Sequence, residues 1–304
     1  MLGKTRRCLV PLIFILLSST TSLHRGQQPS SFASAFQPLP FVNISKQKPF
    51  VTMSSVNNDP NDNNSGLLIS VMQHVGDSVQ LVLASQSPRR REILDMMGLA
   101  GKYRAEPSPL NEEVLQTDLS AEVKSGAISF KDYSQRLAEA KAEALAAEQR
   151  NDCTAPTLYL GSDTIVEWQE QILEKPKSID QAKEMLSKLS GEEHRVHTAV
   201  ALYRVLPVVA TEEENEARMD LIDSFVDTAN VRFTTLSSMD IDSYVGTGDP
   251  MDKAGSYGIQ SIGGQMVEEV RGDFFTVMGL PMHRTSKALA KAIRNQLKTR
   301  IELN

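Results

Sequence analysis

The hydrophobic pattern of the chain changes near residue 67, after which short apolar runs alternate with segments of helical periodicity. Four runs that are apolar or alternate in polarity predict strands over 79–85, 157–168, 194–205 and 230–236. Segments with apolar positions three and four apart predict helices over 87–98, 132–150, 178–191 and 282–300. This order lacks the strict strand–helix–strand alternation of a doubly wound sheet. We therefore expect an α/β fold with a mixed twisted sheet and flanking helices.

Local signals place the ends of two of these helices. Ser87 and Pro88 are the residue types favoured at the N-cap and the first helical position, and Gly98 ends that helix. Ser178 and Gln181 have the spacing of a capping box at the start of another helix. These signals predict sharp helix boundaries at both sites.

Three other stretches have a clear pattern. In the run over 194–205, every second side chain from Val196 to Leu202 belongs to one largely apolar face, which predicts a half-buried strand. The acidic stretch 211–220 is expected to be a surface excursion between two strands. The glycine-rich stretch 246–264 predicts a long loop.

The first 35 residues have the pattern of a signal peptide. A basic start precedes the apolar run from Leu9 to Leu17, which is too short to cross a bilayer. A small-residue cleavage pattern follows at Ala33 to Ala35, directly before Phe36. We therefore expect residues 1–35 to be removed and no membrane segment to remain in the mature form.

Residues 36–66 have the composition of a transit peptide followed by a linker. The segment contains lysine, serine and aromatic residues and has no acidic residue before Asp59. The polar stretch from Asn57 to Gly66 predicts disorder. The Ala-Ser-Ala-Phe junction resembles the bipartite leaders of proteins sent to secondary plastids. We expect a plastid location, with secretion or a cytoplasmic location as alternatives, and a folded domain over 67–304.

Charge and cysteine content narrow the possible partners. The net charge is −6, and residues 1–35 contain four basic residues and no acidic one, so the remainder is more acidic than the whole. Nucleic-acid binders are usually basic, so we expect no nucleic-acid partner. Cys8 lies in the leader, which leaves the mature chain with Cys153 alone and excludes an internal disulfide.

Three consecutive arginines follow the first predicted strand, at the start of a helix. Helix N-termini carry exposed N–H groups and a positive dipole end, so Arg89 and Arg90 are unfavourable there unless an anion binds. Guanidinium groups match phosphate oxygens in bidentate fashion, which makes a triphosphate a suitable ligand. A solvated basic turn is the alternative and is the commoner use of an arginine run.

Two other charged residues lie in apolar surroundings. Lys141 shares a helix face with Leu137 and Leu145, so it either extends outward or points into a cleft. Asp163 interrupts an apolar strand, where a carboxylate is costly unless it faces a site or a metal. A bulge or turn at Gly161 is the alternative explanation for Asp163.

The remaining candidates are ambiguous in isolation. Lys175 precedes a proline and by itself would be a surface residue, and Glu112 is either a metal ligand or an acid of a loop. His194 and His197 lie three apart on a strand and therefore point to opposite faces. We expect these two histidines to be structural.

Several short segments occur in a specific order along the chain. They are LASQSPRRREIL, RLAEAKAEAL, LGSDTIV, EKP, LSGEEHRVHT, DKAGSYGIQ and VMGLP. As a set, from about Leu81 to the end, they resemble the Maf family of nucleoside triphosphate pyrophosphatases. The resemblance implies a two-lobed Maf/ITPase-like architecture with a central cleft. It also implies hydrolysis of a nucleoside triphosphate to the monophosphate and pyrophosphate, with a divalent metal.

The resemblance assigns roles to individual positions. Asp163 matches the proton acceptor that activates the attacking water. The polar positions of the phosphate cleft correspond to Ser85, Arg89, Arg90, Lys141 and Lys175. Glu112 and Asp163 are the expected ligands of the metal, Mg²⁺ or Mn²⁺. Family members commonly dimerise, so we expect a homodimer.

Three positions divide the family by substrate. Arg89 after Ser-Pro, Thr164 after the proton acceptor and Gln260 after YGI together resemble the branch that acts on dTTP and UTP. The Gln260 amide both donates and accepts hydrogen bonds, which suits the edge of a pyrimidine. We therefore expect hydrolysis of dTTP, UTP and modified pyrimidine nucleotides, as house-cleaning of the nucleotide pool. The branch for 7-methyl-GTP tends to carry Trp after Ser-Pro.

Glu174, Ala199 and Ser261 depart from the family pattern, which usually has glycine at these positions. We expect Glu174 to pair with Lys175 and weaken phosphate binding. Maf-like proteins have been linked to cell-division arrest, so a non-catalytic nucleotide-binding regulator of cell or plastid division is one alternative function. A 7-methyl-GTP pyrophosphatase is another, and Arg89 argues against it.

Overall fold

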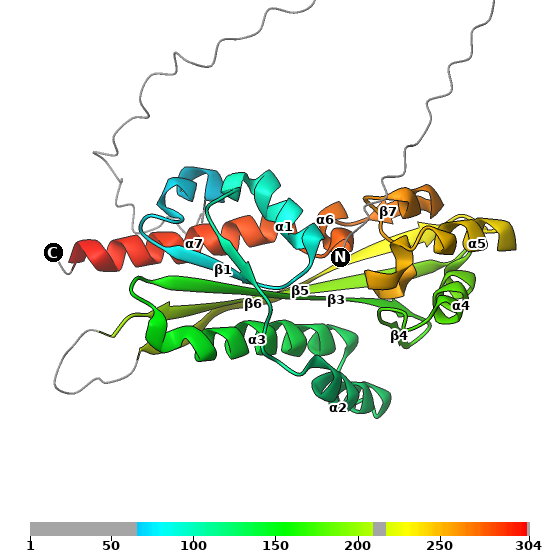
Figure 1. The fold of residues 1–304 in the computed structure, drawn as a ribbon, viewed down its shortest axis with the longest axis horizontal. Helices are drawn as coiled ribbons and strands as arrows, with labels where there is room; N and C mark the ends of the chain where they lie inside the picture. Colours follow the sequence, from blue (N-terminus) through cyan, green and yellow to red (C-terminus); the bar gives the residue numbers. More distant parts are fainter. Residues whose placement is uncertain (1–65, 209–216, 303–304) are drawn as a thin grey trace, which may run out of the picture. The chain divides into compact units, whose positions relative to one another are not determined.

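The computed structural model describes residues 66–208 and 217–302. These residues form a seven-stranded mixed sheet with helices on both faces (Figure 1), which confirms the expected α/β class. The expected signal peptide, the transit peptide with its linker up to residue 65, and residues 211–216 of the acidic stretch lie outside the described residues. In the described ranges, every helix is too short or too polar to traverse a bilayer.

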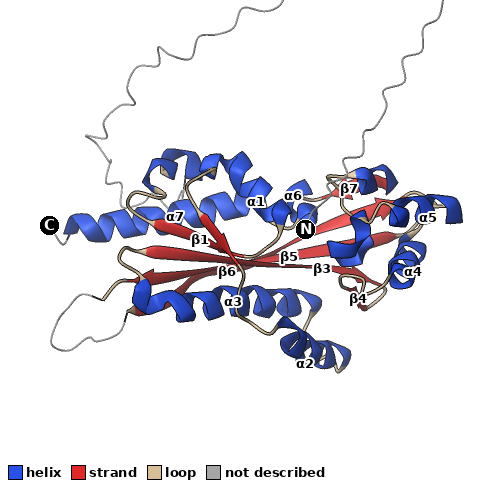
Figure 2. Cartoon of the chain, viewed as in Figure 1, coloured by secondary structure: helices blue, strands red, loops and turns tan. Residues whose placement is uncertain are grey.

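Three long antiparallel strands, β3, β5 and β6, form the centre of the sheet (Figure 2). β1 pairs in parallel with β3 and with the edge strand β2, while β7 extends the other edge and β4 turns back onto β3. The resulting order is β2-β1-β3-β5-β6-β7. The strands are β1 (Gln80–Ala84), β2 (Arg104–Glu106), β3 (Thr157–Trp168), β4 (Gln171–Leu173), β5 (Glu193–Leu206), β6 (Arg218–Phe233) and β7 (Val267–Arg271).

The helices lie on both faces and at one end of the sheet. α3 covers one face, α1 and α7 lie on the other, and α4 and α5 lie at the end where β4 turns back (Figure 1). The helices are α1 (Pro88–Leu94), α2 (Glu112–Lys124), α3 (Phe130–Gln149), α4 (Ile179–Leu189), α5 (Ser238–Gly246), α6 (Phe274–Met278) and α7 (Met282–Glu302).

Side chains of the central strands alternate between two apolar layers, as the period of a strand requires. On one face, Leu83 and Leu160 join a buried cluster with Leu289 of α7. On the other face, Tyr159 packs in a cluster with Ala142 of α3. Both faces of β1 and β3 are therefore buried, which explains why these strands are nearly continuous apolar runs.

The prediction of a half-buried strand over 194–205 is wrong. Every β5 residue from Val196 to Tyr203 is buried, because α3 covers one face and α6 packs on the other. The second buried face, which packs against α3, carries small residues such as Ala199 and Ala201, which the apolar pattern does not reveal. β5 is thus the central strand of the sheet rather than a strand with one exposed face.

A separate apolar cluster occupies the end of the sheet that bears α4 and α5. Leu186 of α4 and Tyr244 of α5 pack there with Val231 and Phe233 of β6. This cluster and the clusters around β1 and β3 form two lobes, as the family resemblance implies.

Several elements lacked a predictive pattern. α2 has one buried residue, Leu119, and β2 and β4 have three residues each. α5, α6 and β7 were also not predicted. β6 begins at Arg218, far before the predicted strand at 230–236, because half-exposed polar residues interrupt its alternation. Arg218 to Asp220 therefore belong to a strand, not to the acidic surface excursion.

The helix-start signals are only partly confirmed. Ser178 caps α4 by accepting from Gln181 N at 3.1 Å, but the Gln181 side chain accepts from Lys177 N at 2.6 Å instead of closing the box on Ser178. Ser87 occupies the N-cap position of α1, yet its side chain makes no capping hydrogen bond with any described residue. Gly98 adopts φ +83° within the π-helical turn Asp95–Leu99 that ends the helix.

Candidate active site

A polar cleft of about 330 Å³ opens where the two lobes meet. Residues of both apolar clusters line it, among them Val166 and Tyr257 from one lobe and Met278 from the other. The cleft is also lined by the predicted site residues Arg89, Arg90, Glu112, Lys141, Asp163, Thr164, Lys175 and Gln260. Tertiary folding thus gathers eight of the nine predicted positions at one site.

Lys141 and Asp163 form a buried ion pair at the floor of this cleft. Lys141 Nζ lies 2.7 Å from Asp163 Oδ1 and 2.7 Å from Glu112 Oε2. Lys141 is only 6% exposed, so it points into the cleft and does not extend outward. Glu112 is the first residue of α2 and not an acid of a loop. One ammonium group therefore holds two carboxylates close together.

Gly161 allows α3 to approach β3 closely enough for this contact. A Cβ atom at Gly161 would lie 2.3 Å from Ala138 O and 2.8 Å from Ala142 Cβ, so any larger residue forces the helix and strand apart. The register continues unbroken, with Gly161 opposite Ala201 and Asp163 opposite Ala199. The alternative of a bulge or turn at Gly161 is therefore wrong, and Asp163 lies in a regular strand.

The charge on Lys141 depends on its two acidic neighbours. Burial and the nearby Arg90 oppose the protonated form, but Asp163 and Glu112 outweigh them and raise the pKa of Lys141. Lys141 therefore stays protonated and supplies a permanent positive charge to the cleft.

Arg90 is held rigidly at the start of α1. Its Nε donates to Gly279 O at 2.9 Å, one terminal nitrogen donates to Ser85 Oγ at 3.0 Å, and the other reaches Thr164 Oγ1 at 3.4 Å. Ser85 is 8% exposed and lies behind Arg90, outside the set of residues that line the cleft. Ser85 thus lies where it orients Arg90. Among the predicted positions, Ser85 is the one that does not line the cleft.

Lys175 and Glu174 lie on the segment between β4 and α4. The expectation that they pair with each other is wrong, because Glu174 accepts a hydrogen bond from the Tyr133 hydroxyl of α3. Burial, together with the repulsion of Asp163, raises the pKa of Glu174. Among the described residues, no carboxylate lies within ion-pair distance of Lys175. Burial and then the nearby cations Arg90 and Lys141 lower the pKa of Lys175.

Gln260 lines the cleft and presents an unsatisfied acceptor. Its Oε1 is buried and has no hydrogen-bond partner among the described residues. Buried polar atoms usually have a partner, so an orphaned carbonyl on a cleft wall indicates a position for a ligand donor.

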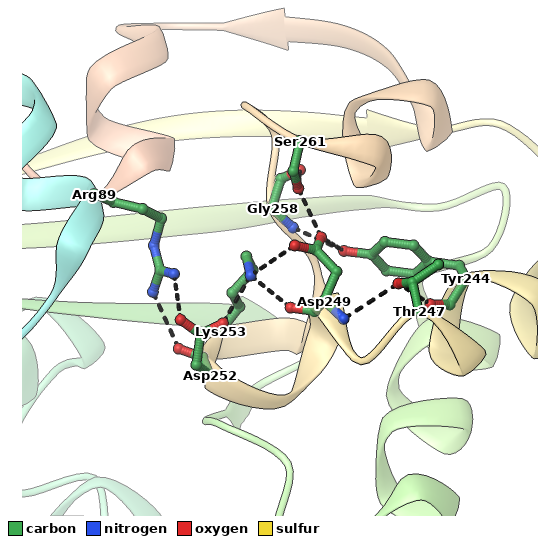
Figure 3. A network of polar contacts seen from close by, with 8 residues as sticks. All are labelled: Arg89, Tyr244, Thr247, Asp249, Asp252, Lys253, Gly258 and Ser261. Atoms are coloured by element: carbon green, nitrogen blue, oxygen red, sulfur yellow. Dashed lines mark hydrogen bonds and ion pairs between the residues drawn. The ribbon is translucent and has the colours of Figure 1, made fainter. Parts of the chain in front are cut away.

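A cation that the sequence analysis missed lies against Gly258, in the turn that carries Gln260. Lys253 lines the cleft at 7% exposure, and its Nζ contacts Asp249 Oδ1 at 3.1 Å and Asp252 Oδ1 at 2.7 Å. Asp252 also accepts from Arg89 at 2.7 Å (Figure 3). The signal that could have found Lys253 is its place in DKAGSYGIQ, in the same glycine-rich loop as Gln260.

The two histidines have structural roles, as expected from their spacing. His194 contacts the Tyr257 hydroxyl at 2.9 Å and packs edge-on against Phe233. His197 lies on the other face, 2.7 Å from Glu167 Oε2. Burial lowers the pKa of His194 to about 3, so this side chain is neutral in the folded protein.

Comparison with known proteins agrees with this geometry. The family model described as Maf-like protein matches residues 80–292. The chain belongs to the Maf-like protein family. It is 42% identical over 214 residues to a dTTP/UTP pyrophosphatase of Shewanella oneidensis, covering 70% of this chain and 98% of that protein.

Two further relatives give the same picture for this Maf-like protein. A dTTP/UTP pyrophosphatase of Vibrio cholerae is 40% identical over 212 residues, which cover 70% of this chain and 97% of the relative. A human protein named probable bifunctional dTTP/UTP pyrophosphatase/methyltransferase protein is 38% identical over 215 residues, or 70% of this chain and 32% of its own.

The acidic side of the Maf-like cleft has a donor set suited to a divalent cation that also contacts phosphate. Glu112 of α2 and Asp163 of β3 both contact the Lys141 ammonium. No cluster of three or more His, Cys, Asp or Glu side chains in the described ranges is arranged to hold a metal by itself. Mg²⁺ is commonly held by one or two carboxylates with substrate phosphates and water, so the pair fits such an ion.

Proposed function

We propose that the protein hydrolyses dTTP, UTP and modified pyrimidine nucleotides to the nucleoside monophosphate and pyrophosphate. The observation that carries the proposal is the cleft in which Asp163 faces three cations, Arg90, Lys141 and Lys175. A triphosphate supplies the negative charge that this concentration of cations requires. Family membership and the relatives named dTTP/UTP pyrophosphatase support the same reaction.

In this proposal, Asp163 accepts a proton from the water that attacks the α-phosphorus. The bond between the α-phosphorus and the oxygen that bridges it to the β-phosphorus breaks, and pyrophosphate leaves with that oxygen. Arg90 and Lys175 hold the phosphate oxygens, while Lys141 fixes the orientation of the Asp163 carboxylate. Positioning and charge neutralisation account for most of the catalysis that such a reaction needs.

We assign Glu112 and Asp163 as the protein ligands of a divalent cation, Mg²⁺ or Mn²⁺. Such a cation would neutralise negative charge on the phosphates. Lys141 Nζ contacts one oxygen of each carboxylate, Glu112 Oε2 and Asp163 Oδ1.

Gln260 supports pyrimidine substrates in particular. Uracil and thymine carry an N3–H donor between two carbonyl oxygens, and the unpartnered Gln260 Oε1 is an acceptor for that hydrogen. Cytosine has an acceptor at N3, so the same amide orientation rejects it.

No observation favours the two alternative functions. The retained Asp163, Lys141 and Lys175 argue against a non-catalytic regulator, and Glu174 accepts from Tyr133 and does not pair with Lys175. Arg89 stands where the 7-methyl-GTP branch tends to carry Trp, which argues against that substrate. The plastid location and the homodimer rest on the leader sequence and on the family resemblance, and both stay proposals.

The test is pyrophosphate release by the full chain with Mg²⁺. The panel contains dTTP, UTP, CTP, 7-methyl-GTP and the standard purine triphosphates. We expect turnover of dTTP and UTP, and a loss of about 100-fold or more in kcat for Asp163→Asn, the size of a general-base contribution. Asp242→Asn, at an exposed position of α5, is the matched control and should leave kcat unchanged.

Other outcomes would overturn the proposal. Full activity of Asp163→Asn would remove Asp163 as proton acceptor. Binding of UTP without turnover of any nucleotide would instead identify a non-catalytic regulator.

A further inference from the structure

Gln260 lies in a tight turn whose two ends converge on one carboxylate. The backbone of Ser261 donates to Gly258 O at 3.2 Å, which closes a turn around Gln260. Ser261 Oγ donates to Asp249 Oδ2 at 2.6 Å. At the other end, Gly258 N donates to the Tyr244 hydroxyl at 3.1 Å, and that hydroxyl donates to the same Asp249 Oδ2 at 2.7 Å (Figure 3).

Asp249 is held in place by a chain of alternating charges. Lys253 contacts Asp249 Oδ1 and, on its other side, Asp252. Asp252 receives two hydrogen bonds from Arg89, one to its carboxylate at 2.7 Å and one to its backbone oxygen at 3.0 Å. The turn that presents Gln260 is therefore linked by direct contacts to a predicted phosphate-binding arginine of α1.

We propose that Asp249 and Ser261 are positioning residues that fix the backbone turn at Gln260, hold its Oε1 acceptor at the base site and so set the selectivity for uracil and thymine over cytosine. This inference rests on the proposed function. No described residue donates to Gln260 Oε1, so the place of this acceptor in the cleft follows from the backbone turn from which the side chain extends. A loosened turn lets the side chain shift and its amide turn over, after which its nitrogen donates to cytosine N3 and its oxygen accepts from the cytosine amino group.

Ser261 makes the inference specific to this chain. A hydroxyl at this position donates a charge-assisted hydrogen bond to Asp249, which a glycine cannot do. Ser261 is half-buried and does not line the cleft, so it acts through Gln260 and not by touching the nucleotide.

The experiment measures kcat/KM for UTP and for CTP with the full chain and Mg²⁺. Ser261→Ala and Ser261→Gly should lower the UTP-to-CTP ratio by about tenfold, the size of one hydrogen bond to a charged group. Ser261→Thr keeps the hydroxyl and should restore the ratio. Asp249→Asn should lower the ratio at least as much as Ser261→Ala, and Asp242→Asn serves as its matched control.

The ratio separates this role from a purely structural one. A general loosening of the fold lowers turnover of both nucleotides by the same factor and leaves the ratio unchanged, which would overturn the inference. A wild-type protein that hydrolyses UTP and CTP equally would also overturn it, while leaving the pyrophosphatase proposal intact. Absence of any turnover would refute the proposed function first. If Asp249→Asn does not fold, the three Ser261 variants decide.

Discussion

Lys175 carries its charge in a cleft where two other cations, Arg90 and Lys141, lie near enough to lower its pKa. Burial contributes most to the lowering of its pKa, and Arg90 and Lys141 lower it further, while Glu112 and Asp163 only partly compensate. A bound triphosphate would favour the protonated form of Lys175, because its oxygens would add negative charge to the partial compensation from Glu112 and Asp163. The residue is thus best suited to a state in which the substrate is bound.

Because its pKa is lowered, Lys175 should lose its proton at a lower pH than an ordinary lysine. We expect kcat/KM for UTP to fall as the pH rises through this region. Lys175→Arg should keep its activity further into the alkaline range, because a guanidinium stays protonated there. Pyrophosphate release across neutral to alkaline pH checks this, with Lys175→Ala as the control that loses about 10- to 100-fold at neutral pH. Identical alkaline declines for wild type and Lys175→Arg would contradict the prediction.

Glu174 shows how a single residue can be misjudged from its neighbours in sequence. Adjacent charges of opposite sign favour a local ion pair, yet the Glu174 carboxylate accepts a hydrogen bond from the Tyr133 hydroxyl of α3. The backbone oxygen of Glu174 also accepts from Gly255 N at 3.2 Å. The segment that carries Lys175 is therefore fastened on two sides by residues far away in the chain.

At the scale of elements, the contact between α3 and β3 decides how Lys141 meets Asp163. Leu137 and Leu145 bury one stripe of the helix, and Lys141 lies between them on the same stripe. Gly161 removes the side chain that would otherwise separate this stripe from the strand. The distance between Lys141 and Asp163 is therefore set by three residues, Leu137, Leu145 and Gly161, that take no part in the proposed chemistry.

Gly161→Ala should reduce both stability and turnover. The added methyl group meets a backbone oxygen, so the helix must move, at a cost of about 1–3 kcal/mol or more in the free energy of unfolding. The same movement pulls Lys141 away from Asp163 and should lower kcat more than it raises KM. Denaturant unfolding and steady-state kinetics measure the two effects. The control is Gly246→Ala, where a Cβ meets no atom within 4 Å and the φ angle is not positive. Unchanged kcat in Gly161→Ala would contradict this account.

At the scale of the whole molecule, burial of His194 couples folding to pH. This histidine packs between Phe233 and Tyr257, in the cluster that builds the lobe of α4 and α5. Its pKa is about 3 in the folded protein, against 6.5 when exposed. The unfolded chain therefore binds a proton that the folded chain excludes, so stability is lost as the pH falls below about 6.5.

Between about pH 7 and pH 5, this effect should remove about 2 kcal/mol from the free energy of unfolding. His194→Phe keeps an aromatic ring but removes the titration, so its stability should fall less steeply over this range. His197, whose pKa is also lowered by burial, is present in both proteins and cancels in the comparison. Urea unfolding at several pH values measures the difference, with exposed His283→Phe as control. Parallel pH profiles for wild type and His194→Phe would show that His194 does not titrate in this way.

The sequence alone predicted the long buried strands and the long helices. Continuous apolar runs and helical stripes are local patterns, so β1, β3, α3, α4 and α7 could be predicted within a few residues. Elements with few buried side chains, such as α2 and β2, gave no comparable signal. The second buried face of β5 was also missed, because its small residues Ala199 and Ala201 give only a weak apolar signal although both are fully buried.

The sequence also pointed to the candidate site residues, through isolated charges such as Asp163 and Lys141 in apolar surroundings and through the ordered family segments. Only the tertiary structure decided which of these charges meet. In the structure, Lys141 lies between Asp163 and Glu112. Glu174 accepts a hydrogen bond from Tyr133, and Lys253 lies against the turn that carries Gln260. Contacts between distant elements follow from how closely the elements pack, and that depends on the whole set of buried side chains and not on any local pattern.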